Sequence, residues 1–330
     1  MENMLNVSSS PHDRASDSTR QIMRDVIIAL IPAAAFGVYR FGFRAFLVLM
    51  VSVTSCVLSE YLYCRFMKLP KHPFEASCVV TGLLLGMNLP STVPLWIPIV
   101  GALFAIIVVK MFYGGLGHNF MNPALAARCF LSICFAKIMT DMAVESGSNA
   151  FIYGQSAIDG VSSATPLSLI KAGENVSLFD EFFGLTGGVI GETCTLALLI
   201  GGIYLLFRKV ITLHIPLAYM LTFAVFILIF GSHGFDMEYV LEEICGGGLM
   251  LGAIFMATDY VTSPVTKTGK IVYGIFLGIL TGIFRLYGNS SEGVSFAIIF
   301  GNLLVPLIEK FTMPHAFGVG KRAYKKTANN

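Results

Sequence analysis

A polar stretch near the middle of the chain carries residue types that can hold a phosphorylated group. Residues 155–167 include Asp159 and Thr165, and Asp-Gly followed by two serines is also ordinary for a solvated turn. The alternative is that the Thr165 hydroxyl accepts a bulky phosphorylated group as an ester without steric clash, because only small residues precede it. Those residues are Ser162, Ser163 and Ala164.

The composition of the chain places this stretch in a membrane protein. Of 330 residues, 55% are hydrophobic and 13% are charged, and the mean hydropathy is +0.75. Soluble domains carry about 25% charged residues, so the composition excludes an ordinary soluble protein. The net charge of +2 predicts no nucleic-acid partner. The seven cysteines lie in apolar runs without a CxxC pair, so neither a cluster motif nor a metal site is predicted.

We predict an all-α integral membrane protein with about ten transmembrane helices, since ten apolar runs approach the roughly 20 residues that a bilayer requires. The runs 77–89 and 240–257 are short and interrupted by glycine. The expected order is a cytoplasmic segment 1–24, a first membrane repeat 25–138, an extracytoplasmic loop 139–183, a second membrane repeat 184–311 and a cytoplasmic tail 312–330. The ten predicted spans are 25–39, 45–64, 77–89, 95–113, 120–138, 184–207, 213–231, 240–257, 271–287 and 293–311.

Basic residues predict the orientation of these spans. With an even number of spans and the N-terminus inside, sixteen Lys and Arg residues fall on the inner side and five on the outer side. Cytoplasmic segments carry the excess of such residues. Both termini are therefore predicted to be cytoplasmic, with the acidic loop 139–183 outside.

The two halves of the chain show the features of an internal repeat. A Gly-Leu-x-Leu-Gly pattern occurs at residues 82–86 and again at 248–252, and a polar break with proline follows each. Such a pattern also arises by chance in a chain rich in glycine and leucine. Five spans per half would make the second repeat inverted, with broken helices forming a site near the bilayer midplane. This feature alone is typical of a secondary transporter or channel.

Asp159-Gly160-Val161-Ser162-Ser163-Ala164-Thr165 resembles a flavinylation motif, Asp-x-x-Ser-(Gly/Ser)-Ala-Thr, in which FMN is attached through its phosphate to the last threonine. The whole chain resembles the RnfD family, the D component of the bacterial Rnf complex, and more distantly the NqrB component of the Na⁺-translocating NADH:quinone reductase. Many members have glycine where this chain has Ser163. The other matching stretches are residues 10–12, 117–124 and 255–259.

This resemblance implies a function and partners. The chain would relay electrons through FMN on Thr165, within a complex that couples ferredoxin:NAD⁺ oxidoreduction to Na⁺ or H⁺ movement in the bacterial cell membrane. A separate flavin transferase would make the bond, recognising Asp159. The other partners would be membrane lipid, the flavin-bearing RnfG, the iron–sulfur components RnfA and RnfE, and RnfB and RnfC. Relatives also imply a non-covalent flavin such as riboflavin. Because the chain has no nucleotide-binding fingerprint, we do not expect it to be active alone.

Polar residues inside apolar runs are costly in a membrane and are candidates for function. Arg128 is expected either to partner a buried carboxylate or a broken-helix carbonyl, or to contact a flavin. Asp259 is expected on the ion path, because carboxylates and unwound carbonyls suit hard cations. Glu60 is interpreted as solvated, and Asp25 as a residue that favours a helix N-terminus. The further candidates for flavin binding are His118, Asn119 and Asn122.

Two other classes of function remain open from the residues themselves. An inverted-repeat solute transporter or channel without a redox role would share the span pattern and carry a plain turn at Thr165. A scaffold protein of a complex would share it as well. A covalently bound flavin distinguishes the redox protein from both.

Overall fold

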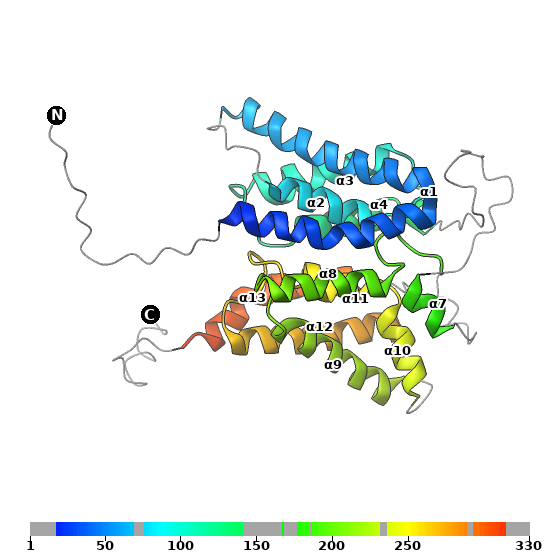
Figure 1. Ribbon diagram of the computed structural model, residues 1–330. Coiled ribbons are helices and arrows are strands. Elements are labelled where there is room, and N and C mark those ends of the chain that lie inside the picture. Colours follow the sequence, from blue (N-terminus) through cyan, green and yellow to red (C-terminus); the bar gives the residue numbers. More distant parts are fainter. Residues whose placement is uncertain are drawn as a thin grey trace, which may run out of the picture.

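The structure is a computed structural model that describes residues 18–68, 76–140, 167, 177–184, 186–231, 236–288 and 293–314. Within these ranges every regular element is a helix, as predicted (Figure 1). The first half contains α1 (Thr19–Phe66), α2 (Ala76–Met87), α3 (Trp96–Leu103) with the π-helix η1 (Phe104–Met111), α4 (Pro123–Cys134) and α5 (Ala136–Met139). The second half contains α7 (Leu178–Phe183), α8 (Thr195–Phe207), α9 (His214–Phe230), α10 (Met237–Cys245), α11 (Leu249–Leu251) with the π-helix η2 (Gly252–Met256), α12 (Lys267–Tyr287) and α13 (Val294–Thr312).

Helix α1 is a hairpin of two arms rather than one straight rod. Its 48 residues reverse at Gly42, where φ is 74° and ψ is −160°, a backbone conformation that glycine adopts most easily. The arms cover the predicted spans 25–39 and 45–64, and Figure 1 shows them as the two blue arms that meet at one end of the bundle. The helix begins at Thr19 behind a capping box of Ser18 and Gln21.

The early start of α1 corrects the interpretation of Asp25. This residue lies beyond the first turn, so it does not favour a helix N-terminus. It is buried and accepts hydrogen bonds from Tyr204 Oη at 3.0 Å and Arg208 Nε at 3.2 Å. Asp25 therefore ties α1 to α8.

Helices occupy all ten predicted runs, but not all of them are long. Three described helices are long and apolar enough to cross a membrane, or four if α10 and α11–η2, which bend by 65° at Gly246–Gly248, form one span. The shorter apolar helices are α2, α3–η1, α4, α8 and α9. The chain is a multi-pass membrane protein by these criteria, while the count of ten spans and the inverted repeat remain predictions.

One predicted span begins in the wrong place. Residues 186–194, assigned to the span 184–207, are not helical, and α8 begins only at Thr195. The segment instead pairs its backbone with the break after α2, since Gly191 N donates to Met87 O at 2.7 Å and Ile190 N to Leu89 O at 3.2 Å. Glycine is needed here because a Cβ on Gly191 would lie 2.6 Å from Met87 Cβ.

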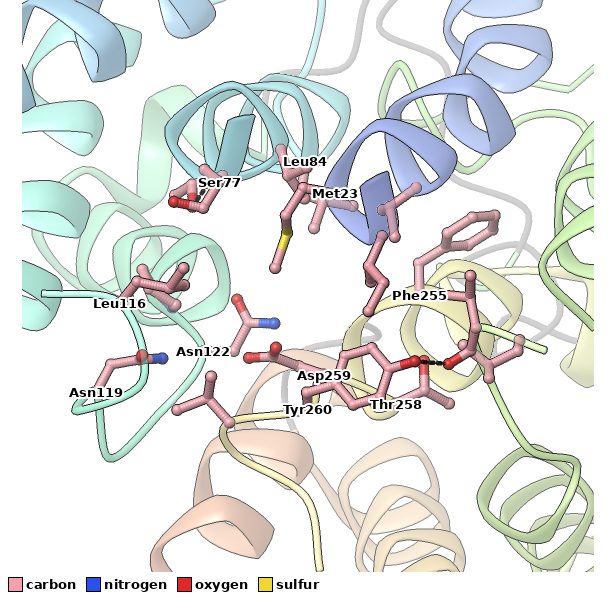
Figure 2. Close-up of a pocket in the computed structure, with 18 of the residues that line it drawn as sticks. Met23, Ser77, Leu84, Leu116, Asn119, Asn122, Phe255, Thr258, Asp259 and Tyr260 are labelled. Carbon is pink, nitrogen blue, oxygen red and sulfur yellow. Dashed lines mark hydrogen bonds between the residues drawn. The ribbon is translucent and has the colours of Figure 1, made fainter. Parts of the chain in front are cut away.

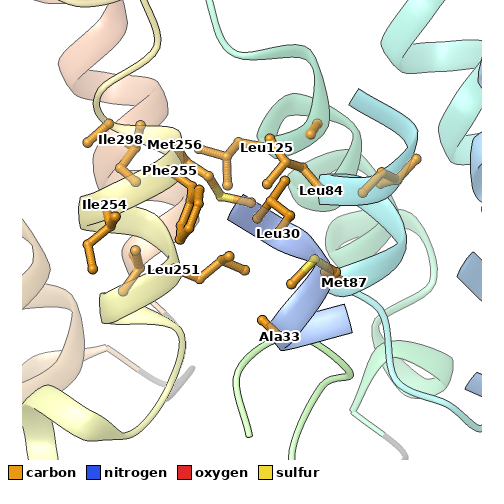
Figure 3. Packing of buried hydrophobic residues seen from close by; sticks show 14 of the residues in the cluster. Leu30, Ala33, Leu84, Met87, Leu125, Leu251, Ile254, Phe255, Met256 and Ile298 are labelled. Atoms are coloured by element: carbon orange, nitrogen blue, oxygen red, sulfur yellow. The ribbon is translucent and has the colours of Figure 1, made fainter. Parts of the chain in front are cut away.

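The two halves of the bundle meet along a buried apolar seam. Side chains of α1, α2 and α4 face those of α11, η2 and α13 across it (Figure 3). Small residues bring the backbones together, as is typical where lipid gives no hydrophobic drive between helices. At Gly201 of α8, an added Cβ would lie 2.1 Å from the carbonyl oxygen of Ala29 in α1. The seam places the polar breaks of both halves in the same region.

Candidate functional site

A cavity of about 80 Å³ lies beside the start of α1 and between the polar segments that follow η1 and η2. We call it the Asp259 cavity; Asn119, Asn122, Asp259, Lys110 and Ser77 contribute to its lining. The side chains of Asn122 and Asp259 project into the same space (Figure 2). Three of the predicted site residues, Asn119, Asn122 and Asp259, are thus brought together from segments more than a hundred residues apart.

Asn122 is positioned by the start of α4. Its Oδ1 accepts from the backbone N–H groups of Ala124 at 3.0 Å and Leu125 at 3.4 Å, so it is the N-cap, and Pro123 takes the first helical position. Its Nδ2 donates to the carbonyl oxygen of Met256 in η2 at 3.4 Å. Asn122 therefore joins the two halves in addition to lining the cavity.

Asp259 lies in the break between η2 and α12 and is half-buried. Its Oδ2 accepts from the Thr262 hydroxyl at 3.1 Å. The neighbouring Tyr260 hydroxyl donates to the carbonyl oxygen of Val210, which fixes this break against the segment after α8. A carboxylate is therefore held at the cavity wall by local hydrogen bonds.

Lys110 forms another part of the wall and is held in an ion pair with Glu60. Lys110, in the π-helix η1, is 2% exposed and donates through Nζ to Glu60 Oε2 at 2.7 Å and to Ser77 Oγ at 2.8 Å. The interpretation of Glu60 as a solvated residue was wrong, because this carboxylate pairs with Lys110 and its side chain is 15% exposed. The π geometry alters the helical register at Lys110, a type of distortion common at functional sites.

Arg128 lies at the centre of the bundle and is 4% exposed. Its Nη1 donates to Asn88 Oδ1 at 2.8 Å, to Glu192 Oε1 at 3.1 Å and to Ser295 Oγ at 3.1 Å. These contacts confirm the prediction that it partners a buried carboxylate. The sequence did not identify Asn88 or Ser295 as partners, although Glu192 was visible as an opposite charge in another apolar run.

A second cavity, of about 20 Å³, lies where α7, α10 and the segment 186–194 meet. We call it the Glu181 cavity; Leu167, Glu181, Glu192 and Cys245 are among its lining residues. Glu181 is 2% exposed, and neither carboxylate oxygen has a hydrogen-bond partner among the described residues. Burial raises the pKa of Glu181 to about 8, with further increases from Glu242 and Glu243.

Arg285 of α12 stabilises the turn next to this cavity. It is 1% exposed, donates to Glu243 Oε2 at 2.9 Å and packs its guanidinium over the Phe223 ring at 5.0 Å from the centroid. It also donates to the carbonyl oxygens of Gly246 at 2.9 Å and Gly247 at 3.2 Å, where α10 ends. Sequence reasoning missed this role, since Arg285 stood among the outer basic residues.

Polar side chains link the two cavities through the middle of the bundle. Glu192 lines the Glu181 cavity and binds Arg128, which binds Asn88. Asn88 Nδ2 in turn lies 3.8 Å from Met256 Sδ, and Asn122 of the Asp259 cavity reaches the carbonyl oxygen of Met256. The segments 82–90 and 248–264 are therefore in contact, while their place at the bilayer midplane and their role in a cofactor or ion path remain predictions.

Other predicted site residues lie elsewhere. His118 is exposed and is not among the residues that line either cavity. The motif residues Asp159, Ser162, Ser163, Ala164 and Thr165 lie outside the described residues. In the described part of the chain no three His, Cys, Asp or Glu residues converge as they would around a metal ion.

Comparison with known proteins identifies the family. The model of the NQR2, RnfD, RnfE family matches residues 6–318. The chain belongs to this family. It is 47% identical over 322 residues to the D component of the Na⁺-translocating ferredoxin:NAD⁺ oxidoreductase complex of Acetobacterium woodii, with 96% of each chain covered.

Of two further members of the family, one is named for proton translocation and the other for translocation of an unspecified ion. The D component of the proton-translocating ferredoxin:NAD⁺ oxidoreductase complex of Clostridium ljungdahlii is 36% identical, with 96% of this chain and 97% of that one covered. The D component of the ion-translocating oxidoreductase complex of Actinobacillus succinogenes is 34% identical, with 96% and 99% covered. Membership of the family is therefore compatible with either cation.

Proposed function

We propose that this chain is the D component of an ion-translocating ferredoxin:NAD⁺ oxidoreductase complex in a bacterial cell membrane. The observation that carries this proposal is the family match, which extends over nearly the whole chain, together with 47% identity to a relative of that name. Polar contacts connect the two cavities through an apolar bundle, which supports a role in ion or electron transfer. The partners are the other components of such a complex: the flavin-bearing RnfG, the iron–sulfur components RnfA and RnfE, and RnfB and RnfC.

Within that complex, the proposed task of the chain is to carry FMN as a phosphoester of Thr165. The motif from Asp159 to Thr165 supports this assignment, and a flavin transferase would make the bond. The described residue nearest to the motif is Leu167. Its side chain is buried and lines the Glu181 cavity, two residues after Thr165 in the sequence. FMN supplies one-electron transfer, which side chains of the chain do not provide.

A second, non-covalent flavin such as riboflavin is a further proposal. The lining of the Asp259 cavity combines amide, hydroxyl and ammonium groups with apolar walls, which suits the edge of a flavin ring. The volume of about 80 Å³ is smaller than the roughly 300–1,000 Å³ of sites that enclose such a molecule. The cavity is therefore too small to enclose a flavin, and this proposal requires the flavin to lie mostly outside it, with only one edge of the ring near Asn119 and Asn122.

Intact-mass analysis tests the covalent flavin. The chain produced together with its flavin transferase should gain the mass of one FMN minus water, and Thr165→Val should abolish the gain. Ser163→Ala is the matched control, because it changes a neighbouring hydroxyl and should leave the adduct in place. An adduct that persists in Thr165→Val would refute the assignment.

The same measurement separates this proposal from its rivals. A solute transporter, a channel or a scaffold protein would show neither the mass gain nor flavin fluorescence after denaturation. A chain without the adduct that still assembles with the oxidoreductase components would retain the proposed complex and lose only the flavin step.

A further inference from the structure

Charge is unevenly balanced around the Glu181 cavity. Four acidic residues, Glu181, Glu192, Glu242 and Glu243, are at most 9% exposed in this region, and the arginines that pair with them are Arg128 and Arg285. Arg128 binds Glu192 and Arg285 binds Glu243. Glu242 also has an interaction partner, so Glu181 is the one of these four carboxylates for which the described residues supply no hydrogen bond. A buried charge of this kind needs compensation.

Glu181 is the residue at which this compensation is missing. In the part of the chain that the structure describes, its two carboxylate oxygens have no hydrogen-bond partner, although Glu181 is 2% exposed. The charged or titratable groups around it are Glu242, Glu243 and Cys245 of α10, Arg285 of α12 and Glu192 of the segment before α8. Arg285 is already engaged by Glu243 and by two backbone carbonyls. A carboxylate thus borders a cavity without a counter-ion.

The cavity has the size and the chemistry to hold one small cation. A volume of about 20 Å³ admits a single water-sized occupant. Hard monovalent cations take oxygen ligands, and the wall contributes the hydroxyl-bearing residues Thr186 and Thr193 and the glycine-rich backbone at Gly187–Gly188 and Gly246–Gly247. Carbonyl oxygens have two lone pairs, so those that accept from Arg285 can still bind a cation.

We propose that the Glu181 cavity is a binding site for one monovalent cation, Na⁺ or a proton, with the Glu181 carboxylate as its charged ligand. The site is separate from the Asp259 cavity, which lies beside the start of α1, whereas α7 and α10 lie at the other end of the bundle (Figure 1). Binding at Glu181 does not require the flavin. Only a role in ion transport rests on the proposed function.

The test measures the thermal stability of the full chain within its purified complex. A ligand that binds the native state alone raises the melting midpoint in a saturable way. At pH 8.5 and constant ionic strength, replacing N-methylglucamine by Na⁺ should raise Tm by about 2–5 °C. Glu181→Gln should abolish this rise or raise the half-saturating Na⁺ concentration at least about tenfold, because the charged ligand is gone. Asp180→Asn, on the same helix, should respond as the wild type does.

A second variant distinguishes loss of the charged ligand from loss of the folded structure. Glu181→Asp keeps the charge but shortens the side chain, so its Na⁺ response should persist with weaker affinity. If the cation is a proton, Na⁺ will have no effect, and Tm will fall as pH rises from about 4.5 to about 8 in the wild type but much less in Glu181→Gln, because the folded state holds the Glu181 proton over that range. An unchanged Na⁺ response in folded Glu181→Gln, or the absence of any Glu181-dependent response to Na⁺ or pH, would overturn the proposal. Turnover by the complex, recorded separately, reports on the proposed function and not on this site.

Discussion

Single residues in the middle of the bundle carry charge that is matched by a partner from another element. Arg128 comes from α4, and its acceptors Asn88, Glu192 and Ser295 come from three other segments. Each partner alone would be costly in an apolar interior. The cluster therefore makes the position of one segment depend on the others.

Removing one partner of the Arg128–Glu192 pair should be severely destabilising. Arg128→Met leaves Glu192 buried without its cation, and breaking such a pair costs about 3–5 kcal/mol. The double variant Arg128→Met/Glu192→Met should recover a large part of that loss. Arg208→Met is the comparison, because the Arg208 side chain is 54% exposed and its partner Asp25 keeps the hydrogen bond from Tyr204, so this loss should be the smaller of the two.

Size-exclusion profiles of the heated complex would measure these differences. Equal loss of the monodisperse peak in Arg128→Met and Arg208→Met would show that the central pair contributes no more than the partly exposed Arg208–Asp25 pair.

Asp259→Asn tests a role for this carboxylate on the ion path. If Asp259 binds the transported cation, the variant should assemble and keep its covalent flavin, while the half-saturating Na⁺ concentration for turnover rises in a Na⁺-driven complex. A purely structural residue would instead lower the amount of assembled complex and leave the ion dependence of the remainder unchanged. Glu238→Gln, an exposed change on α10, is the control. Normal assembly with an unchanged ion response would remove Asp259 from the path.

At the scale of elements, close backbone contacts decide how the two halves fit. The approach of α8 to α1 requires glycine at position 201, where a Cβ would lie 2.1 Å from the Ala29 carbonyl oxygen. Gly201→Val should therefore force the helices apart and reduce the yield of folded chain several-fold. Ile203→Val, at an exposed position of the same helix, should be neutral. Fluorescence-detected size-exclusion chromatography compares the two, and equal yields would contradict the close contact.

The sequence predicted regular elements better than the irregular ones. Apolar runs located most of the helices, because an all-helical chain in a bilayer leaves few alternatives, but they missed the short helix α7 in the predicted loop. They failed at 186–194, where Gly187, Gly188 and Gly191 share an apolar run with α8 but form an irregular segment. Hydropathy does not distinguish a buried irregular segment from a buried helix.

The candidate site was only partly predictable for a related reason. Asn119, Asn122 and Asp259 were identified because polar residues in apolar runs are exceptional, and the structure places them around one cavity. The pairing of Lys110 with Glu60 and the unpartnered carboxylate of Glu181 depend on contacts between distant segments. Without a second aligned sequence, nothing in the local pattern indicates such contacts.

At the scale of the whole molecule, the topology remains to be tested. Helix α1 begins and α13 ends at the same end of the bundle, as two termini on one side of the membrane require (Figure 1). We expect Ala150→Cys, in a cysteine-free chain, to react with a membrane-impermeant thiol reagent from the outside only. A cysteine at position 20, near the start of α1, should react from the cytoplasm only. Cytoplasmic labelling at position 150 would reverse the orientation and the placement of the loop.

The burial of Leu167 has a consequence for where electrons can be exchanged. Its side chain is 3% exposed and lines the Glu181 cavity, and Thr165 is only two residues away. Two residues of chain span at most about 7 Å. The backbone position at which a group is esterified to Thr165 therefore lies within about that distance of Leu167. A flavin held there would meet its redox partners near α7 and α10, at the opposite end of the bundle from the Asp259 cavity. Electron transfer through this flavin would then take place beside the Glu181 cavity, next to the cation site proposed there, whereas an effect of cation binding at Asp259 would have to be transmitted across the bundle.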